Sequence, residues 1–215
     1  MRIDIVADLI CPWCFIGKRR LERAVAARSE LAVSCSWRVF QLNPDMPADG
    51  LPRDLYLRIK YGAGRTAMRV FAAIAEAGRG EGIAFDFDKI RRTPSTLRAH
   101  RLVRLAAAEG CADLVVEALF RGYFEDGLDI GDIDVLAMLA DAAGLDEMTS
   151  RAYLAGDAGA AETRAEEQRV RRLGVNAVPC FIFDHGYAIS GAQEPEMFLP
   201  LFDLATAVRQ SPVKA

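Results

Sequence analysis

Cys11 and Cys14 form a Cys-x-x-Cys motif where the apolar run Ile3 to Ile10 ends and a helical pattern begins. A thiol in the first turn of a helix lies among backbone N–H groups without intrahelical partners, at the positive end of the helix dipole. We therefore expect the Cys11 thiolate to be stabilised and its pKa to fall. The second thiol lies one turn away on the same face, within reach of the first. The spacing predicts a pair that cycles between dithiol and disulfide.

The two residues between the cysteines fit a helix start. Pro12 is favourable there because the N–H that proline lacks would be unpaired in the first turn. Trp13 is a large aromatic side chain beside sulfurs that must reach a partner, and we expect it to be partly exposed and to contact a substrate. The alternative is that Trp13 packs into the core.

The remaining cysteines suggest neither a metal site nor a disulfide framework. Cys35, Cys111 and Cys180 are isolated in the sequence, and the chain holds only 2 histidines. A structural zinc site needs four ligands and usually a second closely spaced pair, so we expect no metal. Each lone cysteine is interpreted as a small buried side chain, and His100 as a partly buried structural residue.

Composition predicts an ordinary soluble protein with a sizeable core. The chain has 215 residues, of which 52% are hydrophobic and 27% charged. A net charge of −3 argues against a nucleic-acid or anionic-membrane partner. No stretch approaches the roughly 18 apolar residues of a membrane helix. The N-terminus contains Asp4 and Asp8 and lacks the apolar segment of a signal peptide, which predicts a cytoplasmic location.

A basic cluster follows the motif at Lys18, Arg19, Arg20 and Arg23. Such runs usually form a solvated helix face, and we interpret this one in that way. Its charge also adds positive potential near Cys11.

The N-terminal part predicts a strand, a helix and a second strand. Alternating apolar residues at 3–7 precede the first helix, which runs to about Arg28, and the segment 31–42 reads as the second strand. A crossover of this length favours a parallel strand pair with the helix on one face. Pro44 and Pro47 then end the pattern, because closely spaced prolines disrupt both helix and sheet.

The segment 51–174 is predicted to be a helical bundle without a second sheet, because its apolar residues recur at helical spacing. Asp132 is the expected N-cap of one helix, and Gly174 ends a charged helix that starts near Ala160. A short helix is expected to place its apolar side chains in the core: Leu55, Leu57, Ile59 and Tyr61. Beyond it, 178–190 reads as a hairpin led by a proline, followed by a last helix from about Glu194.

This order of elements is the thioredoxin order split by a helical insertion, and it resembles the DsbA family. The similarity is closest to the FrnE-like branch, and it rests on signatures found in order along nearly the full chain: CPWCFIGKRRLERAV, FQLNPDMP with Gly50, STLRAHRL, ALFRGYFEDGLDIGD, Gly-Val before a Val-Pro, and YAISGAQ. The resemblance implies an α/β fold, a thioredoxin fold interrupted by a large all-helical insertion. The thioredoxin-like domain would comprise 1–43 and 160–215, and the insertion 44–159.

The resemblance also implies a thiol:disulfide oxidoreductase with Cys11 as the exposed nucleophile and Cys14 as the resolving thiol. The Val178–Pro179 peptide would be cis and face the motif, where an extended substrate can pair with the backbone before the proline. An ordinary trans proline at an edge strand is the alternative. Substrate contacts would come from four residues: Pro12, Trp13, Val178 and Pro179. The implied partner is a disulfide- or thiol-containing polypeptide or a small thiol.

No tightly bound cofactor is implied beyond the redox-active Cys11–Cys14 disulfide itself, with glutathione as an alternative co-substrate. The oligomeric state stays open, and a homodimer is one option. The rival function is that of the related glutathione-dependent 2-hydroxychromene-2-carboxylate isomerases and kappa-type transferases, which generally place serine where Cys11 stands. A third option is a non-catalytic interaction module. The chain departs from the branch at Cys180, which follows the proline, and at 93–96, where an Asn-Thr pair is expected.

Overall fold

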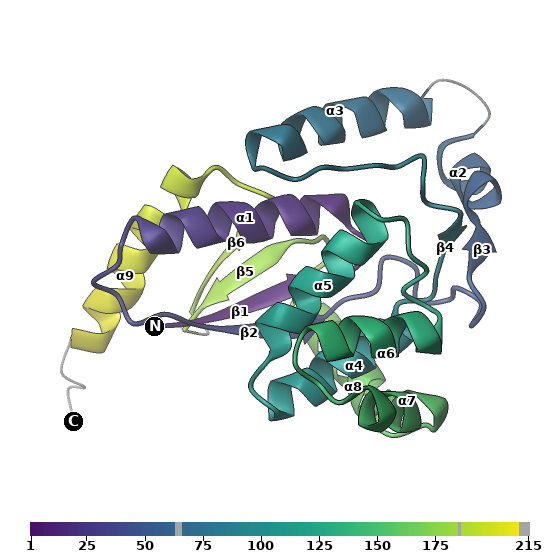
Figure 1. Cartoon of the computed structure of the whole chain (residues 1–215). Coiled ribbons are helices and arrows are strands. Elements are labelled where there is room, and N and C mark those ends of the chain that lie inside the picture. The colour runs from purple at the N-terminus through teal and green to yellow at the C-terminus, as the bar shows by residue number, and fades with distance from the viewer. Residues whose placement is uncertain (63–65, 185, 211–215) are drawn as a thin grey trace.

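The computed structural model describes residues 1–62, 66–184 and 186–210 of the chain. In chain order, its elements are β1 (Arg2–Ala7), α1 (Pro12–Ala26), β2 (Ser34–Val39), β3 (Leu51–Pro52), α2 (Arg53–Tyr61), α3 (Thr66–Gly80), β4 (Arg92–Thr93), α4 (Leu97–Ala108), α5 (Ala112–Phe124), α6 (Ile133–Ala142), α7 (Glu147–Ala155), α8 (Ala160–Arg172), β5 (Cys180–Phe183), β6 (Tyr187–Ser190), the 3₁₀ helix η1 (Pro195–Met197) and α9 (Leu199–Gln210). Figure 1 shows how they are arranged around one central sheet.

The central sheet has the strand order β2-β1-β5-β6. β1 and β2 are parallel, as predicted for strands joined by a crossover helix, and β5 and β6 form the predicted antiparallel hairpin. β1 lies inside the sheet, with Ile5 opposite Trp37 on one side and Phe181 on the other. Its residues after Arg2 are all buried, which explains the nearly continuous apolar run in the sequence.

The chain between β2 and α8 is mainly helical, as expected, but the prediction of no second sheet is wrong. β3 and β4 pair as a two-stranded antiparallel ribbon, with Leu51 opposite Thr93. Two residues per strand are too few for a period of two to be visible in the sequence. The predicted helix ends are confirmed: the Asp132 side chain accepts hydrogen bonds from the first turn of α6, and Gly174, with a φ of +88°, follows α8.

The prediction that the apolar side chains of α2 lie in the core is also wrong. Ile59 is 69% exposed and Leu55 is exposed, whereas Tyr56 is buried. A spacing of two residues spreads the four apolar side chains around a helix and cannot place them on one face. Tyr56 faces inward instead, and Lys60, one turn later, is an exposed residue whose Nζ donates to the Tyr56 hydroxyl at 3.0 Å.

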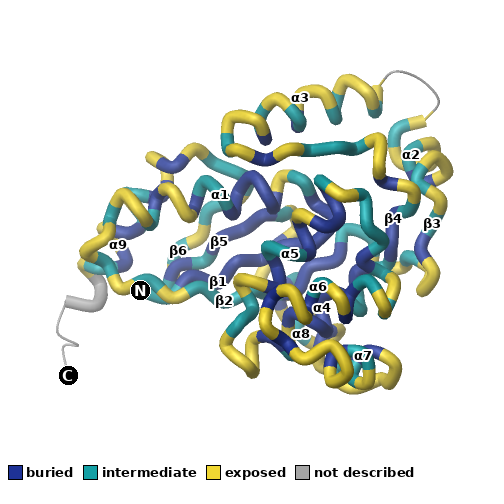
Figure 2. Tube along the Cα trace, viewed as in Figure 1, coloured by how far each residue is buried: buried dark blue, intermediate teal, exposed yellow. Residues whose placement is uncertain are grey.

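One apolar cluster extends from the central sheet into the helical part of the chain. It includes Ile3 of β1, Phe15 of α1 and Phe120 of α5, and the last two rings stack with their centroids 5.0 Å apart. Figure 2 shows the buried residues along β1, β5 and the inner side of α1. The division into 1–43 with 160–215 and 44–159 stays a prediction, and residues from both parts share this core. None of the helices in the described part of the chain combines the length and the apolar composition that a bilayer crossing requires.

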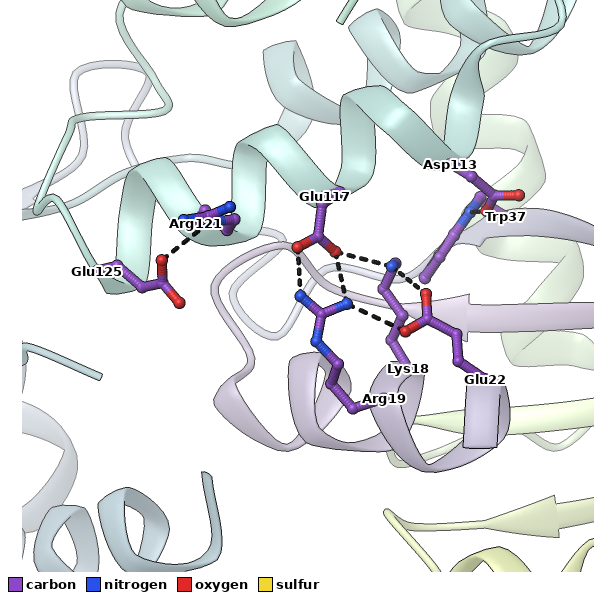
Figure 3. Close-up of polar contacts among 8 residues, drawn as sticks. All are labelled: Lys18, Arg19, Glu22, Trp37, Asp113, Glu117, Arg121 and Glu125. Carbon is purple, nitrogen blue, oxygen red and sulfur yellow. Dashed lines mark hydrogen bonds and ion pairs between the residues drawn. The ribbon is translucent and has the colours of Figure 1, made fainter. Parts of the chain in front are cut away.

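The prediction of a solvated face holds for Arg23 of the basic cluster, whose side chain is 58% exposed, but not for Lys18, Arg19 and Arg20. Lys18 is only 6% exposed, and its Nζ lies 2.8 Å from Glu117 Oε2 of α5. Arg19 also pairs with Glu117, and both basic residues pair with Glu22 within α1, as Figure 3 shows. The partners come from distant parts of the sequence, so the pattern of α1 alone could not reveal them. These carboxylates offset the positive charge that the sequence placed near Cys11.

The remaining two residues of the basic cluster attach α1 to the loop after α3. Arg20 Nε lies 2.8 Å and Arg23 Nη1 2.9 Å from the carboxylate of Glu81, which is almost fully buried. With the contacts of Glu117 on the other side, the helix that bears the cysteine pair is held by polar contacts on two sides.

The indole N–H of Trp37 donates to Asp113 at 2.5 Å and joins β2 to the start of α5 (Figure 3).

Replacing Glu117 with glutamine should lower the free energy of unfolding at pH 7 by about 1 kcal/mol, because Lys18 and Arg19 lose a partly buried carboxylate partner. Burial by itself would raise the pKa of Glu117, but hydrogen bonds from Arg19 and Lys18 lower it below 4.5 overall. A depressed folded-state pKa stabilises the protein above the unfolded-state pKa and ceases to do so as the pH falls through the folded-state value.

Denaturant unfolding of both proteins at pH 7 and in acid measures this effect. The difference should shrink as the pH falls below 4.5, the reference value for an unfolded glutamate. Glu76→Gln is the control, since Glu76 pairs with Arg79 on the exposed face of α3 and its loss should change stability little. A difference between wild type and Glu117→Gln that stays constant into acid would contradict the assignment.

Candidate active site

Cys11 lies at the N-cap of α1. Its φ and ψ are −95° and 109°, Pro12 follows in the first turn, and no side chain makes a capping hydrogen bond. The Cys14 N–H donates to the Cys11 carbonyl at 3.0 Å, and no acidic residue stands in the first turn. The cysteine pair therefore occupies the predicted helix start, where the free N–H groups favour an anion.

The expectation that Cys11 is exposed is wrong. The residue is 5% exposed, because α2, α3 and the loop before β5 cover it. It lines a cavity of about 230 Å³, which provides the access to its sulfur. Trp13 is 39% exposed and lines the same cavity, so its predicted partial exposure is confirmed.

Cys14 is more deeply placed than Cys11, at 1% exposure, and it does not line the cavity. Burial raises the pKa of the Cys14 thiol well above its usual value, and the hydrogen bond with Cys11 and the charge of Cys11 act in the same direction. The two thiols are thus inequivalent. Cys11 faces the cavity, and Cys14 stays protonated behind it.

The peptide bond between Val178 and Pro179 is cis, which confirms the expectation drawn from the resemblance. Its loop faces the motif, since the Cys11 Sγ lies 3.8 Å from the Val178 carbonyl oxygen. α1 approaches this loop closely at Gly17, where an added Cβ would lie 2.9 Å from Pro179 Cγ. A glycine at this position lets the helix pack against the proline.

The cavity is completed by residues of α2, α3 and β4, of which only Thr93 belongs to a segment that the sequence analysis singled out. Arg53, Tyr56 and Lys60 come from α2, Phe71 from α3, and Thr93 from β4. Arg53 Nη1 donates to Thr93 Oγ1 at 3.1 Å, so the segment that departs from the family pattern does reach the site. For Arg53, Tyr56 and Lys60 the sequence indicated no more than a short helix, and nothing in its pattern placed that helix over Cys11.

A buried polar pair lies behind the motif. Asp8 is fully buried; its carboxylate accepts a hydrogen bond from the Leu42 N–H at 2.6 Å, and its backbone carbonyl accepts one from the Cys11 N–H at 3.0 Å. His100 Nε2 lies 3.5 Å from Asp8 Oδ1 and 3.1 Å from the Phe40 carbonyl oxygen. His100 is buried and joins α4 to the ends of β1 and β2, with a neighbour in Asp8 that its sequence position could not indicate.

The lone cysteines differ in their surroundings. Cys180 is buried with Val6 and Phe40 in a second apolar cluster, separate from the one that contains Cys11, and burial raises its pKa. Cys35 and Cys111 are only partly buried, although burial raises the pKa of Cys35 to about 11. Within the described ranges, no group of three or more His, Cys, Asp and Glu side chains could hold a metal ion.

Iodoacetamide should modify Cys11 before Cys14, Cys35 and Cys180 when the reduced protein is treated near pH 7. The thiolate is the reactive form, and the pKa values of Cys14, Cys35 and Cys180 are all raised by burial. Each of those three should react more slowly than Cys11, because burial disfavours its thiolate. Peptide mapping by mass spectrometry during the reaction measures the order. Modification of Cys14 before Cys11 would contradict the inequivalence of the two thiols.

Comparison with known proteins decides the family. The DSBA-like thioredoxin domain matches residues 2–202. The chain belongs to this family. A probable DsbA oxidoreductase from Streptomyces coelicolor is 35% identical, with a TM-score of 0.89 over 100% of this chain and 93% of that one. The predicted fold class, a thioredoxin fold with a helical insertion, is thereby confirmed, and the DsbA-family resemblance with it.

Two more distant structures share the fold of this DSBA-like protein. A 2-hydroxychromene-2-carboxylate isomerase is 15% identical and has a TM-score of 0.70, with 98% of this chain and 97% of that chain covered. The cytosolic disulfide reductase DsbM from Pseudomonas aeruginosa, in a structure with GSH, is 17% identical and has a TM-score of 0.64 over 100% of both chains. At these identities the likeness concerns the fold alone.

Proposed function

We propose that this DSBA-like protein is a thiol:disulfide oxidoreductase whose redox group is the Cys11–Cys14 pair, working through a mixed disulfide. The observation that carries the proposal is the inequivalence of the two thiols. Cys11 lies at a helix N-terminus and lines a cavity, while Cys14 is buried one turn behind it with a raised pKa. Disulfide exchange by a thiol pair needs one accessible thiolate that attacks the substrate and a second thiol that then resolves the mixed disulfide.

The reaction has two steps. The Cys11 thiolate attacks one sulfur of a substrate disulfide RSSR, which forms Cys11–S–S–R and releases RS⁻. Cys14, on losing its proton to solvent, then attacks the Cys11 sulfur, which closes the Cys11–Cys14 disulfide and releases a second RS⁻. The two thiolates take up two protons, so the protein dithiol gives two electrons and two protons to make two RSH. The reverse sequence oxidises two thiols, and the reduction potentials determine the direction.

The electrostatics of the pair favour this order of steps. The charge of Cys11 is one of the causes that raise the pKa of Cys14. When Cys11 enters a mixed disulfide it loses that charge, so the pKa of Cys14 should fall. Cys14 therefore stays protonated while the Cys11 thiolate attacks the substrate. It ionises more easily once the mixed disulfide has formed, when Cys14 must attack in turn.

Pro12, Trp13, Val178 and Pro179 are the proposed substrate contacts. The first three line the Cys11 cavity, and Pro179 follows Val178 through the cis peptide bond and packs against α1 at Gly17. The proposed partner is a thiol or disulfide compound, with no tightly bound cofactor. A cytoplasmic location is proposed because DsbM, which shares the fold, is described as cytosolic. A homodimer stays a prediction.

Glutathione-dependent isomerisation or transfer is the second candidate. It is favoured by the covered position of Cys11 and by the shared fold with a 2-hydroxychromene-2-carboxylate isomerase and with DsbM in complex with GSH. A thiol pair argues for redox chemistry, since isomerisation needs no second thiol. Isomerase turnover that survives Cys11→Ser would favour this second candidate.

Equilibration with glutathione redox buffers tests the proposal. The expected result is one two-electron transition in which Cys11 and Cys14 lose their alkylatable thiols together, while Cys35, Cys111 and Cys180 keep theirs. Alkylation followed by mass spectrometry gives the oxidised fraction at each potential, and Trp13 fluorescence gives an independent signal. The absence of a transition, or oxidation that involves Cys35 or Cys111 instead, would contradict the proposed redox pair.

A further inference from the structure

The Cys11 cavity contains two basic residues that lack acidic partners. Arg53 and Lys60 of α2 both line it, and within the described part of the chain neither makes an ion pair with a carboxylate. Arg58, on the same helix but outside the cavity, does pair with Asp54. The protein has more acidic than basic residues, 30 against 27, so unpaired cations gathered at one site need a reason.

Neutral groups hold both cations in position. The Arg53 guanidinium donates to Thr93 Oγ1 at 3.1 Å and lies 5.1 Å from the centroid of the Phe71 ring. Lys60 Nζ donates to the Tyr56 hydroxyl at 3.0 Å. None of these contacts neutralises a positive charge, so both cations retain their capacity to bind an anion.

The positive charge extends to the reactive sulfur. Burial by itself would lower the pKa of Lys60, but the hydrogen bond to the Tyr56 hydroxyl and the negative charge of the Cys11 thiolate act to raise it, and the overall shift is upward. Lys60 is therefore within electrostatic reach of Cys11. A ligand that places a sulfur at Cys11 can place an anionic group at Lys60.

The size of the cavity limits the ligand. Its volume of about 230 Å³ lies below the range of about 300–1,000 Å³ that is usual for drug-sized ligands. Apolar and aromatic side chains form much of its wall, among them Val70, Phe71 and Ile74. A cavity of this size accepts a small molecule or one arm of a larger one.

We propose that the substrates of this site are small disulfides and thiols that carry carboxylate groups, with Arg53 and Lys60 binding the carboxylates while the substrate sulfur faces Cys11. This inference rests on the proposed function and specifies its substrate class. The chemistry is the exchange given above, with R an anionic group: the protein dithiol loses two electrons and two protons, and the substrate disulfide becomes two anionic thiols. Arg53 and Lys60 contribute binding and orientation and take no part in electron transfer.

The test compares small disulfides that differ in charge. The reduced full-length protein is mixed with 3,3′-dithiodipropionate (two carboxylates), 2-hydroxyethyl disulfide (neutral) or cystamine (two amines), and oxidation of Cys11 and Cys14 is followed by alkylation and mass spectrometry. Each rate is divided by the rate of the same disulfide with a free dithiol, which removes its intrinsic reactivity. We expect the anionic probe to exceed the neutral one by about tenfold at low ionic strength, and the preference to fall as salt is added.

Variants assign the preference to the two cations. The Arg53→Gln, Lys60→Gln double variant should lower the ratio of the anionic-probe rate to the neutral-probe rate by about tenfold. Any change in Cys11 reactivity alters both rates and cancels in their ratio. Arg58→Gln is the matched control, since it removes the same charge from the same helix outside the cavity and should keep the wild-type ratio. The conservative variant Lys60→Arg keeps the positive charge and should keep most of the anionic preference. A loss of preference in the double variant then reflects the missing charge and not a misfolded α2.

The outcomes separate this inference from the function on which it rests. An anionic preference that is absent in wild type, or that is unchanged in the double variant, overturns the inference. If the small disulfides do not react while a cysteine peptide disulfide oxidises the pair, the substrate class is wrong and the oxidoreductase function stands. If no disulfide oxidises the pair, both fail. Glutathione disulfide, which carries several carboxylates, should follow 3,3′-dithiodipropionate in every protein.

Discussion

Replacing Cys11 with serine should reduce the rate of disulfide exchange by at least about a thousandfold. A serine hydroxyl is not ionised at neutral pH, and Cys14 cannot take its place because it is buried and its pKa is raised. The fold should be retained, since serine is a favourable N-cap residue and position 11 is the N-cap of α1. Rates of oxidation by 2-hydroxyethyl disulfide, together with denaturant unfolding, measure both effects.

Cys111→Ser is the matched control for that result. Cys111 also precedes a helix, as the N-cap of α5, but its Sγ donates to the Ala106 carbonyl and it does not line the Cys11 cavity. Its replacement should leave the exchange rate at the wild-type value. Exchange by Cys11→Ser at more than about a tenth of the wild-type rate would exclude Cys11 as the attacking thiol.

Replacing Arg101 with leucine should lower the free energy of unfolding by about 3–5 kcal/mol. Arg101 of α4 is 4% exposed, and its guanidinium is surrounded by backbone carbonyl oxygens. It donates to Ala158 at 2.8 Å, Tyr153 at 2.7 Å, Gly156 at 2.6 Å and Leu154 at 3.3 Å. These carbonyl groups belong to α7 and the turn before α8, and leucine would leave them without their donor.

Denaturant unfolding of Arg101→Leu and Arg104→Leu gives the comparison. Arg104 lies one turn further along α4, is partly exposed and makes only a long ion pair of 3.9 Å with Glu166. Its replacement should cost little. A loss below about 1 kcal/mol in Arg101→Leu would show that the carbonyl groups find other donors. Because Arg101 does not line the Cys11 cavity, the folded variant should keep its exchange rate.

The frame of the fold could be predicted from local patterns. The β1–α1–β2 crossover and the β5–β6 hairpin follow from alternation, helix start signals and turn residues, which act over a few positions. Asp132 and Gly174 likewise mark helix ends, because an aspartate side chain can accept hydrogen bonds from the first turn of a helix and glycine readily adopts a positive φ after the last one. The cis peptide at Pro179 came from the family resemblance, since nothing in the local composition distinguishes it from a trans proline.

The surroundings of Cys11 could not be predicted, because they depend on long-range contacts. The sequence predicts an exposed Lys18, because its partner Glu117 lies 99 residues away along the chain. Cys11 seemed exposed because nothing in the sequence shows that α2 covers it. No sequence pattern singled out Lys60 or Arg53, since their lack of carboxylate partners among the described residues shows only in three dimensions.

Trapping of the mixed disulfide tests the central claim most directly, that Cys11 attacks and Cys14 resolves. Cys14→Ser and Cys11→Ser proteins are treated with 2-hydroxyethyl disulfide, and the adduct is located by intact mass and peptide mapping. The account predicts one stable adduct on Cys11 in Cys14→Ser and no adduct on Cys14 in Cys11→Ser over the same time. Equal trapping on Cys14 in the Cys11→Ser protein would contradict it.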